Sequence, residues 1–281
     1  MPPGGRMAQR TALVIGGSTG IGLASARRFL QEGARVVIAG RDPTKGQDAL
    51  DALAPLGSVQ FLAADASNPA DVDRLFSAAL ELLGGRLDVL FHVAGISGRR
   101  FGDGPLHEAT DAGWDAVLAA NARSVFLTNR AAVRAMLAQD LDDRGLRGSV
   151  LNMGSVLAHS PSPRHFGTIA YAASKGAIRA LTRAAAAAYA PHRIRFNLIA
   201  PALIDTPMAT RATSHPAIRS FLTSKQPLAS GPGSPDDCAE AALALCEPAA
   251  RFITGAELVV DGGWCVSEGQ LPPEPSPEDL P

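Results

Sequence analysis

A tyrosine and a lysine stand four positions apart in GTIAYAASKGAIRALTRAAAAAYA, a run of mostly small residues from Gly167 to Ala190. This composition predicts a helix, and residues four apart lie on one helix face, with about 5–6 Å between Cβ atoms. A phenol has a pKa of about 10, and a neighbouring ammonium lowers that value. Tyr171 beside Lys175 could therefore exchange a proton with a substrate oxygen near neutral pH, as a general acid/base does.

A glycine-rich segment, IGGSTGIGLASARRFL, follows the first apolar run of the chain and places Gly16, Gly20 and Gly22 before a helix. Glycine is needed where the backbone approaches a phosphate closely or takes a positive φ. The helix that follows offers free N–H groups and a partial positive charge to a pyrophosphate. The segment predicts a dinucleotide site, and the plain alternative is a tight turn. For Tyr171 and Lys175 the plain alternative is a tyrosine at the edge of the core beside a lysine that reaches solvent.

Short β-rich runs alternate along the chain with longer runs rich in alanine and leucine. The strands are nearly all apolar, which indicates burial on both faces, as in a parallel sheet with helices on each side. We predict one α/β domain over residues 10–265, a doubly wound Rossmann-type sheet of about seven strands. The strands are expected to begin at Thr11, Ala34, Val59, Leu87, Gly148, Arg193 and Ala256. The helices are expected over 21–31, 44–53, 69–83, 110–138, 170–190 and 235–245.

The composition excludes several classes of protein. The chain has 281 residues, 46% of them hydrophobic, and a formal net charge of -1, so we expect no nucleic-acid or membrane-surface partner. No apolar run reaches the roughly 18 residues of a membrane span, and MPPGGRMAQR lacks the apolar core of a signal peptide. Cys238, Cys246 and Cys265 lack metal-ligand spacing, so we expect no metal site but reduced thiols in a cytoplasmic protein. Residues 1–9 are predicted to be a disordered extension and 266–281 a flexible, acidic, proline-rich tail.

The glycine loop and the tyrosine–lysine pair together resemble the short-chain dehydrogenase/reductase family, in its single-domain branch, over about residues 10–265. The family's usual loop is T-G-x-x-x-G-x-G; here Ile15 replaces the threonine, which mostly ties the turn together, so we expect binding to survive. The resemblance implies hydride transfer between a nicotinamide and a carbinol carbon of a small alcohol or ketone. The resemblance implies that Tyr171 transfers the proton to or from the substrate oxygen. It also implies that Lys175 lowers the pKa of the phenol and binds the nicotinamide ribose.

Asn121 falls on another residue of the family's catalytic set, because NARSVF resembles N-x-x-[GS]-x-F. The resemblance implies that it kinks a long helix and holds a water that links Lys175 to solvent. The plain alternative is a polar residue on an exposed helix face.

The last member of that set is a serine, and NMGS at the end of the fifth strand resembles N-[IV]-S-S, which selects Ser155. Its hydroxyl would hold the substrate oxygen. The gap of 16 positions from Ser155 to Tyr171 is longer than in most of the family, so Ser160 and Ser162 in VLAHSPSPRHFGTIA are competitors. We prefer Ser155 because it directly ends the strand, and we expect the additional residues to bulge over the substrate pocket.

The end of the second strand, VVIAGRDP, predicts the cofactor. An acidic residue there binds the ribose 2′-hydroxyl and repels a 2′-phosphate, whereas a basic residue favours the phosphate. Gly40 falls where NAD-selective members carry Asp, and Arg41 follows, so NADP is favoured and NAD is the alternative. Asp42 could pair with Arg41 or face the ribose. Asp65 matches the family's acid at the adenine edge, with Ala66 beside it.

The resemblance assigns a larger set of positions to the cofactor. It comprises Gly16, Ser18, Thr19, Gly20, Ile21, Gly22, Arg41, Asp65, Ala66, Ala94, Gly95, Tyr171, Lys175, Pro201, Ile204 and Thr206. Two motifs depart from the family's pattern: Ala202 replaces a glycine in PALIDTPM, and HVAG replaces N-N-A-G. Since those asparagines tie the sheet edge together, we expect His92 and Val93 to alter local hydrogen bonding rather than abolish activity.

The substrate is left open by the sequence. Three variable segments are expected to wall its pocket, and they carry Arg99, Arg100, His159, His165 and Arg211. Such donors suit a polar substrate, such as a polyol, a sugar or a hydroxy acid, although loop arginines are commonly just solvated. The segment from Asp205 is expected to act as a mobile lid.

Other functions stay open. A 3-oxoacyl-(acyl-carrier-protein) reductase would need a basic docking patch, which Arg99 and Arg100 could supply. The four catalytic-type residues argue against an idle dinucleotide-binding sensor or scaffold. An epimerase or dehydratase of nucleotide sugars is usually longer and has a G-x-x-G-x-x-G loop. The family's last strand, here LVVDGGW up to Trp264, usually helps to build a tetramer, so we expect a homo-oligomer, tetramer or dimer.

Overall fold

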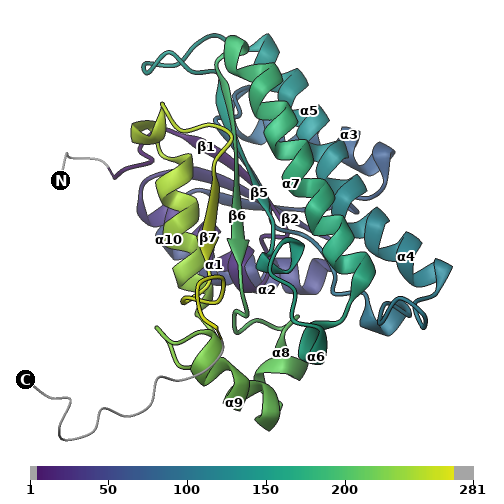
Figure 1. Ribbon diagram of the computed structural model, residues 1–281. Coiled ribbons are helices and arrows are strands. Elements are labelled where there is room, and N and C mark those ends of the chain that lie inside the picture. The colour runs from purple at the N-terminus through teal and green to yellow at the C-terminus, as the bar shows by residue number, and fades with distance from the viewer. Residues whose placement is uncertain (1–4, 269–281) are drawn as a thin grey trace, which may run out of the picture.

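The computed structural model describes residues 5–268, in which a wholly parallel seven-stranded sheet lies between two layers of helices (Figure 1). The strands follow the order β3-β2-β1-β4-β5-β6-β7 across the sheet. Their bounds are β1 (Thr11–Ile15), β2 (Arg35–Gly40), β3 (Val59–Ala63), β4 (Val89–His92), β5 (Gly148–Met153), β6 (Ile194–Pro201) and β7 (Glu257–Val260). The predicted doubly wound α/β fold is thereby confirmed.

Helices cover both faces of the sheet because successive side chains of each strand point to opposite faces. In β1, Ala12 and Val14 pack into the core below α1, α2 and α10, whereas Leu13 and Ile15 pack into the core below α3, α5 and α7. These helices are α1 (Gly20–Gln31), α2 (Pro43–Leu53), α3 (Pro69–Leu82), α5 (Ser124–Ala138), α7 (Ile169–Tyr189) and α10 (Pro235–Cys246). In Figure 1, α3, α5 and α7 form one layer on the right of the sheet.

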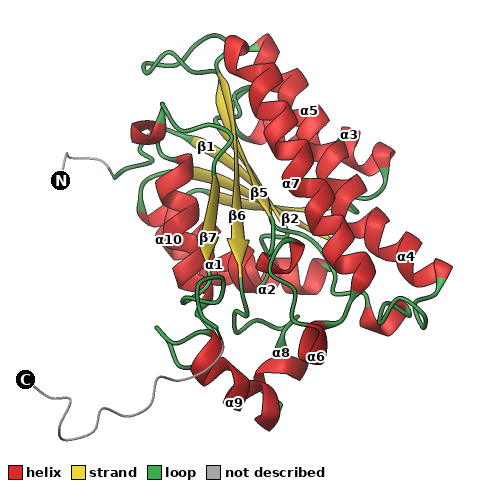
Figure 2. Ribbon diagram, viewed as in Figure 1, coloured by secondary structure: helices red, strands yellow, loops and turns green. Residues whose placement is uncertain are grey.

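The strand order reverses beside β1, since the chain passes from β3 at one edge back to β4 on the other side of β1. In such sheets a crevice opens at the carboxyl ends of the strands next to the reversal. Beyond these ends lie loops and the short helices α6 (Pro163–Phe166), α8 (Thr210–Thr213) and α9 (Pro216–Lys225), as Figure 2 shows below β6 and β7. The fold therefore gathers the residues that follow each strand at one edge.

The long helix predicted over 110–138 is interrupted. It consists of α4 (Asp111–Leu118), a π-helical turn η3 (Ala119–Arg123) and then α5. Short 3-10 turns complete the connections: η1 (Ala54–Leu56), η2 (Arg99–Phe101), η4 (Val156–Ala158), η5 (Ala190–His192) and η6 (Pro248–Ala250). The structure also forms α6, α8 and α9, which the sequence patterns did not predict.

The structure differs from the predicted disorder of residues 1–9, because residues 5–9 pack against the domain. Met7 is fully buried, and its N–H donates to the carbonyl of Glu32 at 2.9 Å. Arg6 pairs with Glu247 at 2.6 Å and donates its N–H to the Glu32 carboxylate. The burial of Met7 and the bonds of Arg6 to Glu32 and Glu247 thus order a segment that was predicted to be disordered from its composition. Residues 1–4 and the predicted tail from 269 onwards lie outside the described residues.

Within residues 5–268, every helix is too short or too polar to cross a membrane. The same part of the chain contains no cluster of His, Cys, Asp and Glu that could bind a metal ion.

We expect Met7→Ala to lower the free energy of unfolding by about 2–4 kcal/mol, since it removes a fully buried side chain and leaves a cavity. Urea denaturation followed by circular dichroism measures the change. The matched control is Met208→Ala, at a side chain that is 54% exposed, which should cost less than about 1 kcal/mol. Equal losses in the two variants would contradict the packing of residues 5–9.

Candidate active site

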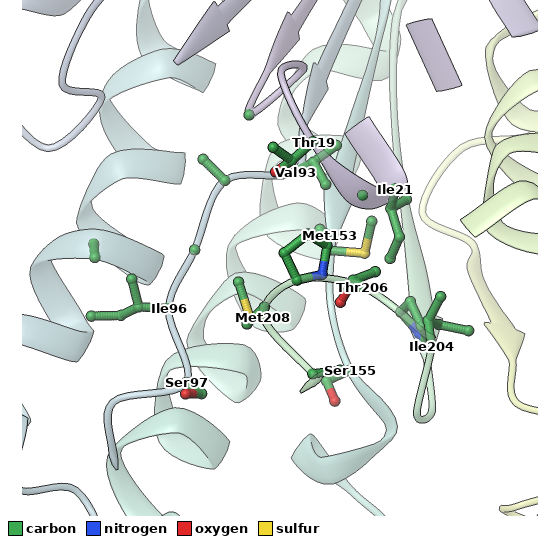
Figure 3. Close-up of a pocket in the computed structure, with 18 of the residues that line it drawn as sticks. Thr19, Ile21, Val93, Ile96, Ser97, Met153, Ser155, Ile204, Thr206 and Met208 are labelled. Carbon is green, nitrogen blue, oxygen red and sulfur yellow. The ribbon is translucent and has the colours of Figure 1, made fainter. Parts of the chain in front are cut away.

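A cavity of about 860 Å³ opens at the carboxyl edge of the sheet (Figure 3). Its walls come from the loops that follow all of the first six strands, together with α7 and α8. Figure 3 shows Thr19 and Val93 near one end and Ser155, Ile96 and Ser97 toward the other. Ligand pockets usually measure about 300–1,000 Å³, so the cavity has room for a cofactor together with a small substrate.

The glycine loop between β1 and α1 fits the pyrophosphate of a dinucleotide. Gly16 has a φ of 85°, and a Cβ there would lie 2.7 Å from the amide nitrogen of Ala94. A Cβ on Gly22 would lie 2.1 Å from the Gly16 carbonyl oxygen, so both positions require glycine. Helix α1 begins without a side-chain cap and without an acidic residue in its first turn. Its first N–H groups are therefore available to an anion.

Nearly all of the residues predicted to bind the cofactor line this cavity. They are Gly16, Ser18, Thr19, Gly20, Ile21, Arg41, Asp65, Ala66, Ala94, Gly95, Tyr171, Lys175, Pro201, Ile204 and Thr206. Gly22 is the exception among the predicted set: it lies inside α1 against Gly16, where its missing side chain lets the loop close on the helix.

Basic groups gather where the second strand ends. Arg41 is exposed and lines the cavity, and Lys45 lines it as well. The carboxylate of Asp42 accepts hydrogen bonds from the N–H groups of Thr44 and Lys45, so it caps α2. The structure thus gives Asp42 a role that the sequence analysis did not consider, and its other carboxylate oxygen lies 3.7 Å from the ammonium of Lys45. A Cβ on Gly40 would lie 3.0 Å from the Ser18 hydroxyl, which leaves little space there for a carboxylate side chain.

Asp65 lines the cavity near Arg41, and its side chain is engaged in a local turn. Its carboxylate accepts hydrogen bonds from the N–H of Ser67 at 2.9 Å and from the Ser67 hydroxyl at 2.7 Å. Burial by itself raises the pKa of Asp65, but the Ser67 hydrogen bonds and the charge of Arg41 outweigh it and hold the pKa below its usual value. Asp65 is therefore an anion that keeps the loop after β3 in shape.

Tyr171 and Ser155 both line the cavity, and the Ser155 hydroxyl lies close enough to the phenol to lower its pKa. Ser155 follows β5 directly, and its hydroxyl also accepts from the N–H of Leu157 at 3.2 Å, which begins the η4 turn. The competitors Ser160 and Ser162 are not among the described residues that line the cavity. The preference for Ser155 therefore agrees with the geometry.

Lys175 lies behind Tyr171 and is almost fully buried. Its ammonium donates a hydrogen bond to the carbonyl of Met153 at 2.9 Å and lies 5.6 Å from the centre of the Tyr171 ring. Burial in this setting lowers the pKa of Lys175 to about 8. The side chain thus reaches the end of β5 from the second turn of α7.

The predicted lowering of the Tyr171 pKa by Lys175 is not met in this structure. Burial raises the pKa of Tyr171 above its ordinary value, and the hydrogen bond from Ser155 offsets only part of that rise. The ammonium of Lys175 is directed at the Met153 carbonyl rather than at the phenol oxygen. Desolvation therefore dominates over the charge of the neighbour.

Asn121 lies in the π-helical turn, fully buried, and is not among the described residues that line the cavity. Its amide oxygen accepts from the N–H of Ile96 at 2.8 Å, and its amide nitrogen donates to the Ile96 carbonyl and to the Ser174 hydroxyl. A Cβ on Gly95 would lie 2.9 Å from that oxygen and 3.8 Å from the Lys175 ammonium. The predicted kink is present, and Asn121 joins the loop after β4 to the helix that carries Lys175.

His92 occupies the place of an asparagine in the resembling family and is buried at the end of β4. One ring nitrogen lies 2.7 Å from the Thr128 hydroxyl and the other lies 3.2 Å from the Ser124 hydroxyl. Burial first, and the charge of Lys175 second, lower the pKa of His92 to about 3. His92 is therefore a neutral hydrogen-bonding residue that ties the sheet to α5.

The longer loop before Tyr171 forms η4 and α6 and walls the far end of the cavity, as expected from its length. Leu157 and Phe166 line the cavity from this loop, and Phe166 packs edge-on against Trp264 with 5.7 Å between ring centres. Sequence reasoning had placed Trp264 only at the last strand. Its role in the wall depends on the packing of α9 beneath it, which no local pattern encodes.

Comparison with known proteins agrees with this geometry. Residues 16–265 match the sequence model of a family described as enoyl-(acyl carrier protein) reductase. The chain is 34% identical over 263 residues to 2,5-dichloro-2,5-cyclohexadiene-1,4-diol dehydrogenase of Sphingobium indicum, covering 93% of this chain and 98% of that protein. It is 33% identical over 262 residues to the NADP-dependent (R)-specific alcohol dehydrogenase of Lentilactobacillus kefiri, covering 92% and 98%.

The fold is also similar to that of solved structures. A short-chain type dehydrogenase/reductase from Mycobacterium ulcerans superposes with a TM-score of 0.84 at 30% identity, covering 93% of this chain and 91% of that one.

We expect Gly16→Ala to raise the Kd for a nicotinamide dinucleotide by about tenfold or more, because its Cβ would strain the positive φ and press on Ala94. Quenching of tryptophan fluorescence measures the binding. Gly176→Ala is the matched control, since a Cβ there meets nothing within 4 Å and α7 gains a better helix former. Unchanged binding in Gly16→Ala would exclude the loop as the pyrophosphate site.

Proposed function

The chain belongs to the short-chain dehydrogenase/reductase family of NAD(P)-dependent oxidoreductases that act on CH–OH groups, and within that activity we propose that Tyr171 is the general acid/base. The observation that carries this proposal is the meeting of Tyr171, Ser155 and Lys175 in the same cavity as the glycine loop. A secondary alcohol and its ketone are the proposed substrate and product.

The chemistry divides between the cofactor and the protein. A bound nicotinamide supplies the hydride to the ketone carbon or accepts it from the carbinol carbon. Tyr171 donates its phenolic proton to the ketone oxygen and takes up the hydroxyl proton in the reverse direction. Ser155 donates a hydrogen bond to the same oxygen and thereby holds it beside the phenol.

The pKa values favour one direction at neutral pH. Burial raises the pKa of Tyr171, so the phenol keeps the proton that reduction of a ketone consumes. Oxidation needs the phenolate and becomes faster as the pH rises. Lys175, with a pKa of about 8, is mostly charged at neutral pH and is placed to bind ribose hydroxyls and to stabilise the phenolate once it forms.

Arg41 supports NADP as the preferred cofactor. Its guanidinium is exposed at the cavity wall, Lys45 adds a second positive charge, and Asp42 is occupied in capping α2. A 2′-phosphate would find the guanidinium of Arg41 there, with Lys45, which lies 3.7 Å from the Asp42 carboxylate, as a second cation. The Lentilactobacillus kefiri relative is named as NADP-dependent, which agrees with this assignment.

The substrate is proposed to be polar, because Ser97, Arg99 and Arg211 line the cavity among apolar residues. Two other reactions have specific support: reduction of an enoyl thioester, from the description of the matched family, and reduction of a 3-oxoacyl thioester, from the basic loop at Arg99 and Arg100. A panel of alcohols, ketones and both thioesters, followed at the nicotinamide absorbance, separates these reactions. The cytoplasmic location and a dimeric or tetrameric assembly are part of the proposal and rest on the family resemblance.

We expect Tyr171→Phe to lower kcat by at least about a hundredfold and to leave the Kd for NADPH within about threefold, because only the proton carrier is lost. Steady-state kinetics and fluorescence titration measure the two quantities. The chain has two tyrosines, and Tyr189→Phe on the same helix is the matched control, since Tyr189 packs against Phe196 away from the cavity. Near-full activity of Tyr171→Phe would refute the mechanism.

We expect Arg41→Ala to raise the Kd for NADPH by about tenfold and to change that for NADH less than about threefold, since the lost guanidinium would bind only the 2′-phosphate. Arg74→Ala, at a side chain that is 72% exposed on α3, should change neither constant. An equal response of both cofactors to Arg41→Ala would show that Arg41 does not recognise the phosphate.

A further inference from the structure

Two arginines from distant parts of the chain meet at the substrate end of the cavity. Arg99 begins the η2 turn after β4, and Arg211 lies on α8 in the segment after β6. Both line the cavity together with Tyr171 and Ser155. In Figure 3, Ser97 and Met208, which come shortly before these two arginines in sequence, lie on the wall of the same pocket as Ser155.

Arg99 is held near the reacting end by its neighbours. Its guanidinium donates a hydrogen bond to the carbonyl of His165 at 3.2 Å, in the loop before Tyr171. The charge of Asp103 also acts on Arg99, and its carboxylate accepts hydrogen bonds from the N–H groups of Ala170 and Tyr171 at 3.0 and 2.9 Å. These contacts place Arg99 beside the first turn of α7, which carries the phenol.

Both arginines are exposed to solvent at the cavity wall, and they lie near enough for the charge of one to act on the other. Desolvation lowers the pKa of Arg99, the charge of Arg211 lowers it further, and the opposing effect of Asp103 is the smallest of the three. Asp103 is already bonded to two backbone N–H groups, which stabilise its negative charge. The acidic residues that line the described cavity are Asp42 and Asp65, and both lie at the end beside Arg41.

Apart from Ser97, Ser155 and Thr168, the side chains at this end of the cavity are largely apolar. Leu157, Phe166, Met208 and Trp264 line it, and the Trp264 indole already donates its N–H to the carbonyl of Ser160. A polyol or sugar would bring hydroxyl groups against these side chains without a partner for each of them, which is costly. A molecule with a short apolar stretch and one charged end fits the surface better.

We infer that Arg99 and Arg211 bind an oxyanion of the substrate, so that the enzyme acts on hydroxy acids and oxo acids whose carboxylate, or similar anion, lies apart from the reacting carbon. This inference rests on the proposed function and narrows its substrate class. Two guanidinium groups bind a carboxylate through charge-assisted hydrogen bonds and select against the uncharged ester. Because Arg211 belongs to the segment after β6 and Arg99 to the loop after β4, the anion also bridges the two walls of the cavity.

The pyrophosphate of the cofactor is the alternative anion for Arg211, because Arg211 follows Thr206 and Pro207 at the cavity wall. The two ligands make opposite predictions. An arginine that binds the pyrophosphate affects every substrate and raises the Kd for the cofactor, whereas one that binds the substrate affects only charged substrates.

The test compares 3-oxobutanoate, 4-oxopentanoate and 5-oxohexanoate with their methyl esters, using NADPH and the wild-type enzyme, Arg99→Gln and Arg211→Gln. For at least one chain length we expect wild-type kcat/KM to be about tenfold higher for the acid than for the ester. Each glutamine variant should lower kcat/KM for that acid by about tenfold to a hundredfold and leave that for the ester within about threefold. Glutamine keeps a donor for the His165 carbonyl, so the loop at Arg99 can stay in place.

Arg100→Gln is the matched control, because Arg100 is adjacent in sequence but stacks on Phe101 and is not among the described residues that line the cavity. It should change neither acid nor ester kinetics. The inference is overturned if esters are preferred at every chain length, or if acids and esters respond equally to Arg99→Gln and Arg211→Gln. It is overturned for Arg211 if that variant raises the Kd for NADPH by about tenfold with an unchanged acid-to-ester ratio.

A binding measurement separates this inference from the proposed function. Quenching of Trp264 fluorescence by the three oxo acids, read against a Trp264→Phe blank, requires no turnover. Saturable quenching that Arg99→Gln or Arg211→Gln weakens by about tenfold supports the anion site even if no ketone is reduced, a result that would refute only the proposed reaction. Turnover of esters that depends on Tyr171, without any saturable binding of the acids, would refute the anion site and leave the reaction standing.

Discussion

The hydrogen bond from the buried ammonium of Lys175 to the carbonyl of Met153 fixes α7 against the end of β5, and the geometry of the site depends on it. Burying a cation costs free energy, and the lowering of the Lys175 pKa to about 8 reflects that cost. The bond draws the N-terminal part of α7 to the sheet edge at which Ser155 begins the next turn, so Tyr171 on the same helix face lies near the serine hydroxyl. An ammonium has three donors, which leaves Lys175 able to bind a ligand in the cavity that it lines.

Buried polar groups behind the cavity secure this arrangement from the opposite side. Asn121 binds both backbone groups of Ile96 and the hydroxyl of Ser174, and a Cβ on Gly95 would press against its amide. His92 binds two hydroxyl groups of α5 where the resembling family has an asparagine. Because Asn121 and His92 are hydrogen-bonded within the fold, they hold the loop after β4 and the π-helical turn in place, although neither side chain is among the described residues that line the cavity. With His92 in place of the family's asparagine, the end of β4 bonds to the hydroxyl groups of Ser124 and Thr128, so the sheet is still held to α5.

The sheet, the glycine loop and the pair Tyr171 and Lys175 could be predicted because they depend on local patterns: strand–helix alternation, glycines at a turn and a four-residue helical spacing. Ser155 was predicted from the resemblance of NMGS to a family motif. The sequence did not predict the direction of the Tyr171 pKa, since that depends on desolvation by residues remote in sequence. The ordering of Met7 likewise depends on contacts with Glu32 and the rest of the core. Helices α8 and α9 are short and rich in polar residues. Their formation therefore depends on tertiary packing against Trp264. The capping of α2 by Asp42 was also not predicted, since the sequence analysis considered only pairing with Arg41 or contact with the ribose.

The two ends of the cavity are built on different cores, which explains how one fold can keep a cofactor and vary its substrate. The cofactor end adjoins the two large clusters on the two faces of the sheet, whereas the substrate end rests on a small separate cluster that includes Val156, Ala212, Leu222 and Trp264. The segment after β6 is anchored at its base by Gln226, which is buried and bonded to both backbone groups of Leu203. Beyond that anchor, α8 and α9 contact the domain mainly through the small cluster. Changes in this cluster can therefore reshape the wall that carries Arg211 without disturbing the strands that position the glycine loop and Lys175.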